Sequence, residues 1–342
     1  MDGREMIAGA ARALIAEGAD SIPKLVLLRK VLRTPAGDPE TIEAHRAALQ
    51  DQHVLELVAA QRNDGGWGRF HSADSRARCR IPTTEWAVRR ALAMGLDAAS
   101  PVLTAAVAYL SGLVEGRLDL PDPPEKNDRW STGKELFAAA TLALVSPDLP
   151  ILDRVWAKWV EIGRRTFESG IYDSEAEVRA HRALTGASVR DSYLTMNNHY
   201  ALALLTSRPD CLPRELECSL LAWLCSGATV IKYVDWRPGN LPDPVVPSQV
   251  ERWFRAAELL CRFEGWRKRG RGALDWLWLQ RREGGLWDFG PQRQQSWALP
   301  LSRDWRSRRR RVHDYSTRAL VLLGNSYRPC RAGSIPGSVD AR

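Results

Sequence analysis

The chain has 342 residues with a net charge of +8, and hydrophobic residues, including 14 Trp, make up 44% of it. That composition is enough for a large core, but no run approaches the roughly 20 apolar residues that a membrane-spanning helix needs. The apolar stretch near the N-terminus is too short and too interrupted for a secretory signal, so we expect a cytoplasmic protein.

Helical periodicity begins near the N-terminus. Residues 5–17 and 22–33 predict two helices, and a Pro-rich turn separates this N-terminal segment, over 1–40, from a larger domain over 41–324. Within that domain, the apolar spacing predicts helices over 40–61, 83–94, 102–114, 132–145, 149–168, 174–185, 192–205, 213–225, 248–263, 267–281 and 313–323. We find no strand pattern, so the predicted class is all-α. The tail over 325–342 lacks periodicity, and we expect it to be disordered.

Two glycine-tryptophan turns are the most informative motifs. Residues 61–68 read QRNDGGWG, and residues 280–287 read QRREGGLW, with one more residue between the Gln and the Trp. In each copy a helix ends at the Gln, and the Gly pair permits a left-handed turn. The Trp ring can pack over that turn while its N–H stays hydrogen-bonded. Two such copies in one chain indicate a repeat architecture.

The pattern Q-x-x-x-G-x-W, carried by Gln61, Gly65 and Trp67, resembles the QW repeat of squalene and terpenoid cyclases. The G-G-W-G element is similar to one in the β-subunits of protein prenyltransferases. Both families are α/α toroids, in which helical hairpins form a ring and the inner helices line a central cavity. The resemblance implies a single toroid of about five to six hairpins that binds or transforms an isoprenoid-type apolar ligand.

By that resemblance, function lies where the N-terminal ends of the inner helices open onto one mouth of the cavity. The candidate catalytic acids at those ends are Glu85, Glu135, Asp191 and Asp314. The candidate ligand-binding residues are Trp67, Arg69, His71, Trp130, Tyr193, Asn198, His199, Trp287, Asp288 and Tyr315. Polar residues at helix starts also serve as caps, and a structural hydrogen-bond network would equally explain Asn198 and His199.

The established chemistries of these families lack their motifs here. The chain has no D-x-D-D acid motif and no D-D-x-x-D motif for diphosphate. Its six Cys are scattered without C-x-x-C spacing, and Ser316 stands where a zinc-binding Cys would follow Asp314. We therefore expect no metal and no cofactor. A lone acid could still act beside Trp and Tyr rings that stabilise a carbocation by cation–π attraction.

Two other functions stay open. One is a non-catalytic toroid that acts as a scaffold for a protein, peptide or lipid partner. The other is a phosphate or nucleic-acid binder that uses residues 308–311 in the basic loop over 291–311, although no nucleic-acid-binding signature supports it. Within that segment, Arg308, Arg309, Arg310 and Arg311 could make peripheral contact with an anionic membrane.

Overall fold

The computed structural model describes residues 3–74, 80–190, 192–243, 245–282, 284–292 and 296–327. Every regular element in these ranges is helical, and their only strand-like features are isolated β-bridges. The all-α class predicted from the sequence is therefore confirmed. The helices are α1 (Gly3–Ala16), α2 (Ser21–Val26), α3 (Pro39–Leu49), α4 (Gln52–Ala59), α5 (Thr84–Ala93), α6 (Pro101–Val114), α7 (Trp130–Val145), α8 (Asp153–Thr166), α9 (Ser174–Thr185), α10 (His199–Leu205), α11 (Arg214–Leu224), α12 (Pro247–Leu260), α13 (Trp266–Arg269), α14 (Arg271–Leu279) and α15 (Arg308–Ser326).

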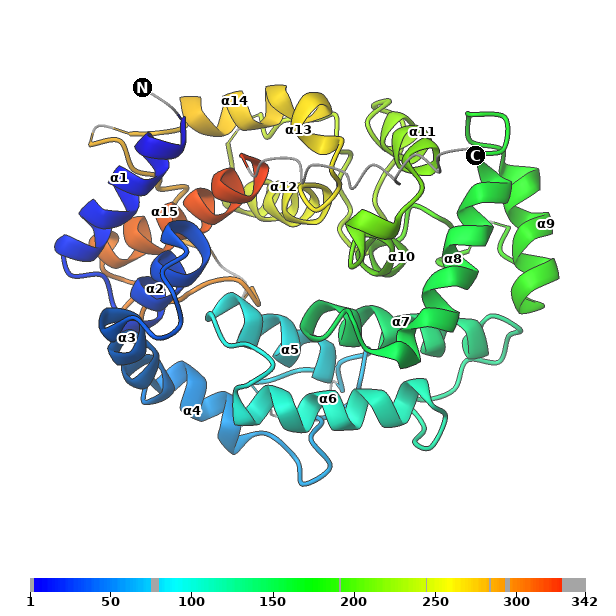
Figure 1. The fold of residues 1–342 in the computed structure, drawn as a ribbon, viewed down its shortest axis with the longest axis horizontal. Helices are drawn as coiled ribbons and strands as arrows, with labels where there is room; N and C mark the ends of the chain where they lie inside the picture. The colour runs from blue at the N-terminus through cyan, green and yellow to red at the C-terminus, as the bar shows by residue number, and fades with distance from the viewer. Residues whose placement is uncertain are drawn as a thin grey trace, which may run out of the picture.

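The helices follow one another around the molecule (Figure 1), and the last of them, α15, packs against α1. Arg4 in α1 donates to the carbonyl oxygen of Tyr327, just after α15, with nitrogen–oxygen distances of 3.0 and 2.7 Å. The two ends of the described chain are thus held together. In the same view, α5, α7, α10 and α12 lie nearer the centre of the molecule than α6, α9, α11 and α14.

The two glycine-tryptophan turns make the same indole hydrogen bond. The Nε1 of Trp67 donates to the carbonyl oxygen of Leu57 at 2.9 Å, and that of Trp287 donates to the carbonyl oxygen of Leu277 at 2.7 Å. Both indoles are fully buried. In each turn, the Trp therefore satisfies a carbonyl in the last turn of the preceding helix while its ring packs in the core.

A second shared bond shows how the turns correspond. The backbone N–H of each Trp donates to a hydroxyl in the next inner helix, Thr84 in α5 at 2.8 Å or Ser316 in α15 at 3.0 Å. If the two turns are aligned on these hydrogen bonds, Gln61 is equivalent to Arg281. Gln280 is instead the C-cap of α14. The extra residue read from the sequence is therefore not an insertion within the turn.

Two predicted helices are divided in the structure. The helix expected over 40–61 is α3 and α4, because the Asp51 side chain accepts a hydrogen bond from His53 N at 2.9 Å and starts a new helix. The helix expected over 267–281 is α13 and α14, which meet at Gly270. A Cβ there would lie 2.2 Å from the Trp266 ring, so the close approach requires glycine.

The polar residues expected in the middle of a helix over 192–205 lie at its start instead. α10 begins at His199, and Asn198 is its N-cap, with the side-chain oxygen 2.8 Å from the N–H of Ala201. The predicted start at residue 192 was wrong, because residues 192–198 continue the apolar spacing but form turns in the structure. Asn is unfavourable inside a helix but favourable as an N-cap, which agrees with the position of Asn198.

The helix predicted over 313–323 is longer in the structure, where it is α15. α15 begins at Arg308 rather than at residue 313, so the arginines of residues 308–311 form its first turn and not part of a loop. The predicted disordered tail over 325–342 overlaps this helix, which includes residues 325 and 326. Residues 328–342 lie outside the described residues.

Gly65 and Gly285 occupy equivalent positions with positive φ angles of 92° and 77°. A Cβ on Gly65 would lie 2.2 Å from the carbonyl oxygen of Ala105, whereas one on Gly285 would meet nothing within 4 Å. Both Gly65→Ala and Gly285→Ala are expected to pay about 1–2 kcal/mol for a left-handed backbone. Only Gly65→Ala must also displace neighbouring backbone, which adds about 1–3 kcal/mol. Thermal unfolding followed by circular dichroism measures the difference, and equal losses in the two variants would contradict it.

Candidate functional site

Two cavities lie along the same inner helices. The larger has a volume of about 1350 Å³ and the smaller about 360 Å³. In α12, Glu251 and Arg255 line the small cavity and Glu258 lines the large one, which is also lined by Arg262 just after the helix. These positions are three or four residues apart, so one face of the helix borders both spaces. Trp297 lines both cavities, which therefore lie next to each other.

The same order holds in two other helices. In α5, Glu85 and Arg89 line the small cavity and Leu92 lines the large one. His199, the first residue of α10, lines the small cavity, and Thr206, its C-cap, lines the large one. The small cavity therefore lies toward the N-terminal ends of these helices, and the large cavity toward their C-terminal ends. The N-terminal ends are where the sequence places its candidate residues.

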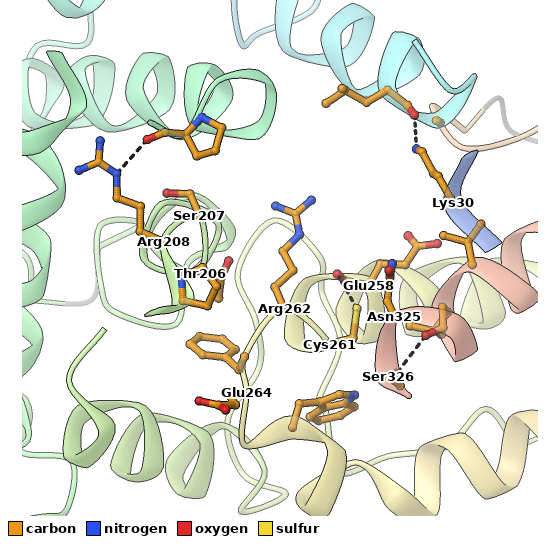
Figure 2. Close-up of a pocket in the computed structure, with 18 of the residues that line it drawn as sticks. Lys30, Thr206, Ser207, Arg208, Glu258, Cys261, Arg262, Glu264, Asn325 and Ser326 are labelled. Carbon is orange, nitrogen blue, oxygen red and sulfur yellow. Dashed lines mark hydrogen bonds between the residues drawn. The ribbon is translucent and has the colours of Figure 1, made fainter. Parts of the chain in front are cut away.

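Basic side chains are prominent in the large cavity, and most of them bind carbonyls where helices end. Lys30 donates to Leu92 O at the end of α5, and Arg208 donates to Pro147 O after α7 (Figure 2). The others are Arg29 to Gly95 O, Arg33 to Gly324 O and Arg267 to Ser326 O. Cations at helix C-termini satisfy open carbonyls and interact favourably with the helix dipole, so packing explains much of this charge.

Arg262 is another cation at the large cavity, and its charge affects the pKa of Lys30. Figure 2 shows the Arg262 side chain extending from the end of α12 into the space between the helices. Burial, followed by the charge of Arg262, lowers the pKa of Lys30 to about 8. In the lining of the large cavity, basic side chains thus outnumber acidic ones, while much of the surface is apolar.

Three polar side chains meet in the small cavity. The Tyr200 hydroxyl donates to Glu85 Oε2 at 2.5 Å and lies 2.9 Å from His71 Nδ1. His71 Nδ1 is also 3.3 Å from Glu85 Oε2. They come from the loop before α5, the first turn of α5 and the first turn of α10. A carboxylate, an imidazole and a phenol in mutual contact are groups that can take up and pass on a proton.

Aromatic rings surround these three side chains. The His71 ring stacks on Phe137, with centroids 4.6 Å apart and an interplanar angle of 18°. Phe137 also packs against Tyr200 at 4.6 Å and Tyr193 at 6.0 Å. Tyr233 lies edge-on to His71 and Tyr200, at 5.4 and 5.1 Å. Of these rings, His71, Tyr200 and Tyr233 line the small cavity, together with Trp86 and Trp297, so aromatic side chains form much of its wall.

The surroundings of the small cavity fix the protonation of its groups. Burial lowers the pKa of His71, but the hydrogen bond and charge of Glu85 outweigh it, and the pKa is raised overall. Burial and then the Glu85 charge raise the pKa of Tyr200 well above its ordinary value. Burial, followed by nearby arginine charges, lowers the pKa of His199 well below its ordinary value. Near neutral pH, Tyr200 and His199 are therefore uncharged.

A buried carboxylate fixes the loop that carries His71. Asp122 accepts hydrogen bonds from the backbone N–H groups of residues 70–72 at distances of 2.7 to 3.0 Å. Thr83 caps α5 through its side chain and so places Glu85 in the first turn of that helix. The loop and the helix start are thus both held by local hydrogen bonds, and His71 faces Glu85 as a result.

Three of the candidate residues, Glu85, His71 and His199, line the small cavity. Tyr193 does not line it but packs against Phe137, which stacks on His71. Asn198 lies next to the cavity as the cap of α10 and is fully buried. These residues come from three separate segments, and the structure brings them together.

Two of the candidate acids, Glu135 and Asp314, do not line the small cavity. Glu135 forms ion pairs with Lys158 at 2.6 Å and Arg154 at 3.2 Å, which link α7 to α8. Asp191 lies outside the described residues. Neither Arg69, which pairs with Asp74 at 3.5 Å, nor the half-buried Trp130 at the start of α7 lines a cavity.

Asp314 is fully buried and holds a loop. It accepts hydrogen bonds from the N–H groups of Leu301 and Ser302 at 2.6 and 2.9 Å, and from the Ser302 hydroxyl at 2.6 Å. Burial raises its pKa to about 6, although these hydrogen bonds act in the opposite direction. Asp314 lines neither cavity, but the loop that it anchors carries Trp297.

The remaining candidates make structural contacts. Trp67 and Trp287 hold the two turns described above. The hydroxyl of Tyr315 donates to Gly290 O at 3.1 Å. Two of the arginines at residues 308–311 face the buried Asp288, and the other two donate to the carbonyl oxygens of residues 17 and 18 after α1. These contacts tie α15 to the N-terminal helices, and membrane contact through the same arginines stays a prediction.

Sequence reasoning missed Phe137, Tyr200, Tyr233, Arg89 and Arg255. Arg89 could have been found, because it lies four residues after Glu85 and thus on the same face of α5. Arg255 bears the same relation to Glu251 in α12. Tyr200 was hidden by the misplaced start of α10. Tyr233 has a φ of 68° in an irregular loop, and no pattern in the sequence indicated it.

No protein-family model, curated protein or solved structure matches this chain. Within the described ranges, none of the helices has both the length and the apolar character that crossing a membrane requires. Those ranges also contain no group of three or more His, Cys, Asp or Glu side chains arranged to hold a metal ion.

Glu85→Gln is expected to lower the pKa of His71 below that of free histidine, because burial remains while the charge that offsets it is lost. In the unchanged protein, the His71–Glu85 pair stabilises the fold fully below about pH 6.5 and is lost as the pH rises through the raised pKa of His71. Titration of the imidazole by NMR measures the shift. Glu135→Gln is the control, since its carboxylate pairs with Lys158. If His71 has the same pKa in both variants, Glu85 is not the cause of its raised pKa.

Proposed function

We propose that this chain is an α/α toroid and that it binds an isoprenoid-type apolar ligand, with the aromatic wall of the small cavity as the principal contact. Support for the toroid comes from the order of helices around the molecule, the contact between α1 and α15, and the two equivalent turns. One face each of α5, α10 and α12 borders both cavities, as inner helices of a ring would do.

The observation that carries the proposal is the ring cluster around Glu85. The rings of Tyr200, Tyr233, Trp86 and Trp297 line the cavity and give it apolar area, and Phe137 packs against Tyr200 outside the lining. An unsaturated hydrocarbon chain gains by leaving water for such a wall. The large cavity below would then take the remainder of a long ligand, because Trp297 borders both spaces.

Any reaction would fit Glu85 better as a proton acceptor than as an initiating acid. Glu85 Oε2 lies 3.3 Å from His71 Nδ1 and acts as a hydrogen-bond acceptor. Tyr200 donates to the same oxygen and would hold the carboxylate in place. The chain's lack of a D-x-D-D motif agrees with this role.

Binding can be tested with farnesol as the probe, followed by quenching of tryptophan fluorescence, since Trp86 and Trp297 line the cavity. Tyr233→Asn removes a ring but keeps a residue that tolerates left-handed backbone, and it is expected to weaken farnesol binding about tenfold. Asp235→Asn is the matched control. It lies in the same turn, is exposed and also has positive φ, of 56°.

Native mass spectrometry of protein from its own host, followed by lipid extraction, gives an independent result. A co-purifying isoprenoid supports the proposal. A polypeptide partner with no bound lipid, together with equal farnesol affinity for the two variants, would overturn it. If the extracted ligand is converted by the protein, Glu85→Gln is expected to retain binding and to slow conversion about a hundredfold or more.

A further inference from the structure

We propose that Lys30 is an amine nucleophile in the large cavity and that it forms an imine with an apolar aldehyde that enters this cavity. The covalent bond forms in the large cavity and does not depend on a ligand in the small one, so the proposal goes beyond the proposed function. Its chemistry needs only the lysine and the aldehyde.

The position of Lys30 in the fold gives its amine access to the cavity. Lys30 lies in a π-helical segment, Leu27–Leu32, that follows α2 and packs against α1 and α15. Such segments are rare and often occur at functional sites. Leu27 and Leu28 are buried in the core, whereas Lys30 is half-buried and lines the large cavity. The segment therefore places a primary amine in the wall of a space of about 1350 Å³, which is large enough for a small organic molecule.

Lys30 has no carboxylate partner among the described residues. Its Nζ donates to Leu92 O at the end of α5 (Figure 2). That carbonyl oxygen also accepts from the N–H of Gly95 at 3.2 Å, so it keeps a partner when the amine turns to a ligand. The neighbouring Arg29, by contrast, pairs with Asp97 at 2.9 Å. Lys30 is thus held by one neutral contact that the fold can spare.

The charges around Lys30 favour the neutral amine. Burial and then the charge of Arg262 lower its pKa to about 8, and Arg29 acts in the same direction. Glu258 opposes them, but this carboxylate pairs with the buried Arg318 at 2.6 Å. Because free lysine has a pKa of about 10.4, the neutral form of Lys30 near pH 7 is roughly a hundredfold or more commoner. Desolvation and a neighbouring cation are the usual means by which a protein activates a lysine as a nucleophile.

The reaction balances with the groups named. The Lys30 ammonium first releases a proton to water, and the lone pair of the neutral amine then adds to the carbonyl carbon of the aldehyde. The resulting carbinolamine loses water and leaves a neutral imine, so no oxidant or reductant is needed. The imine also removes a positive charge beside Arg29 and Arg262, which relieves the repulsion that lowers the pKa of Lys30.

The lining of the cavity selects the class of aldehyde. Leu92, Phe263, Trp266 and Leu322 line the same space as Lys30. These side chains offer apolar surface to a hydrocarbon chain. The excess of basic side chains opposes a cationic ligand. An aldehyde with an uncharged apolar chain therefore fits the large cavity.

Reductive labelling of the full-length protein tests the site, with octanal as the aldehyde and sodium cyanoborohydride as the reductant that traps the imine. Octanal has no conjugated double bond, so the thiol of Cys261 in the same cavity cannot capture it by conjugate addition. Peptide mass spectrometry compares Lys30 with the exposed Lys268. With limiting octanal near pH 7, Lys30 is expected to be labelled at least about tenfold faster. The preference should be smaller with acetaldehyde, which has no chain to contact the apolar lining.

Three variants examine the amine and its surroundings. Lys30→Arg keeps the positive charge but forms no imine, and it is expected to lose the fast phase of octanal uptake in the intact-protein mass. Arg262→Gln is expected to move the pH midpoint of Lys30 labelling upward, because it removes a charge that lowers the pKa of Lys30. Arg252→Gln is the matched control, since Arg252 is exposed on α12. Equal midpoints in these two variants would contradict the part given to Arg262.

Two results would overturn the inference as a whole: Lys30 is labelled no faster than Lys268, or acetaldehyde shows the same preference for Lys30 as octanal. Both are measured on the unchanged protein, so a misfolded variant cannot cause them. The test with farnesol is read separately. If farnesol binds while Lys30 shows no preference, the proposed function stands and the imine site fails. If Lys30 is labelled preferentially while farnesol does not bind, the imine site stands and the ligand of the small cavity is wrong.

Discussion

Buried carboxylates that bind backbone N–H groups hold the loops on which both cavities depend. Asp122 binds residues 70–72, and Asp314 binds residues 301 and 302. A carboxylate can be buried in this way because several N–H donors replace its water. The first contact sets His71 opposite Glu85, and the second supports the loop with Trp297, which borders both cavities. The loops are thus fixed by hydrogen bonds from carboxylates that line neither cavity, and the side chains that line the cavities do not have to hold the loops.

The division into two cavities follows from the direction of the helices around them. Where α5 and α7 end, open carbonyls bind cations such as Lys30 and Arg208, so the large cavity has an excess of basic side chains. Where α5 and α10 begin, caps such as Thr83 and Asn198 satisfy the N–H groups, so the next residues are available for other contacts. Those next residues include Glu85 and Tyr200. One set of helices therefore supplies an aromatic space at one end and a cationic space at the other.

Local patterns predicted local structure well. The turn at Gly65 and Trp67 follows from a left-handed glycine and a buried indole, and both are in place. The pairing of Asp122 with residues 70–72 could not be predicted, because it joins segments about fifty residues apart and nothing in either segment requires it. Tyr200 was missed for a different reason. It follows the cap Asn198 by two residues, just as Glu85 follows Thr83, but that likeness is visible only once Asn198 is recognised as a cap.

The balance of charge separates two kinds of chemistry that an aromatic cavity can support. Rings alone would favour a carbocation. Here Arg89 and Arg255 face the same space, and Glu85 and Glu251 are held by their own partners. Positive charge on a ligand would be opposed by these two arginines. The arrangement of charges around the aromatic rings therefore argues against a carbocation in this space and for an uncharged apolar group.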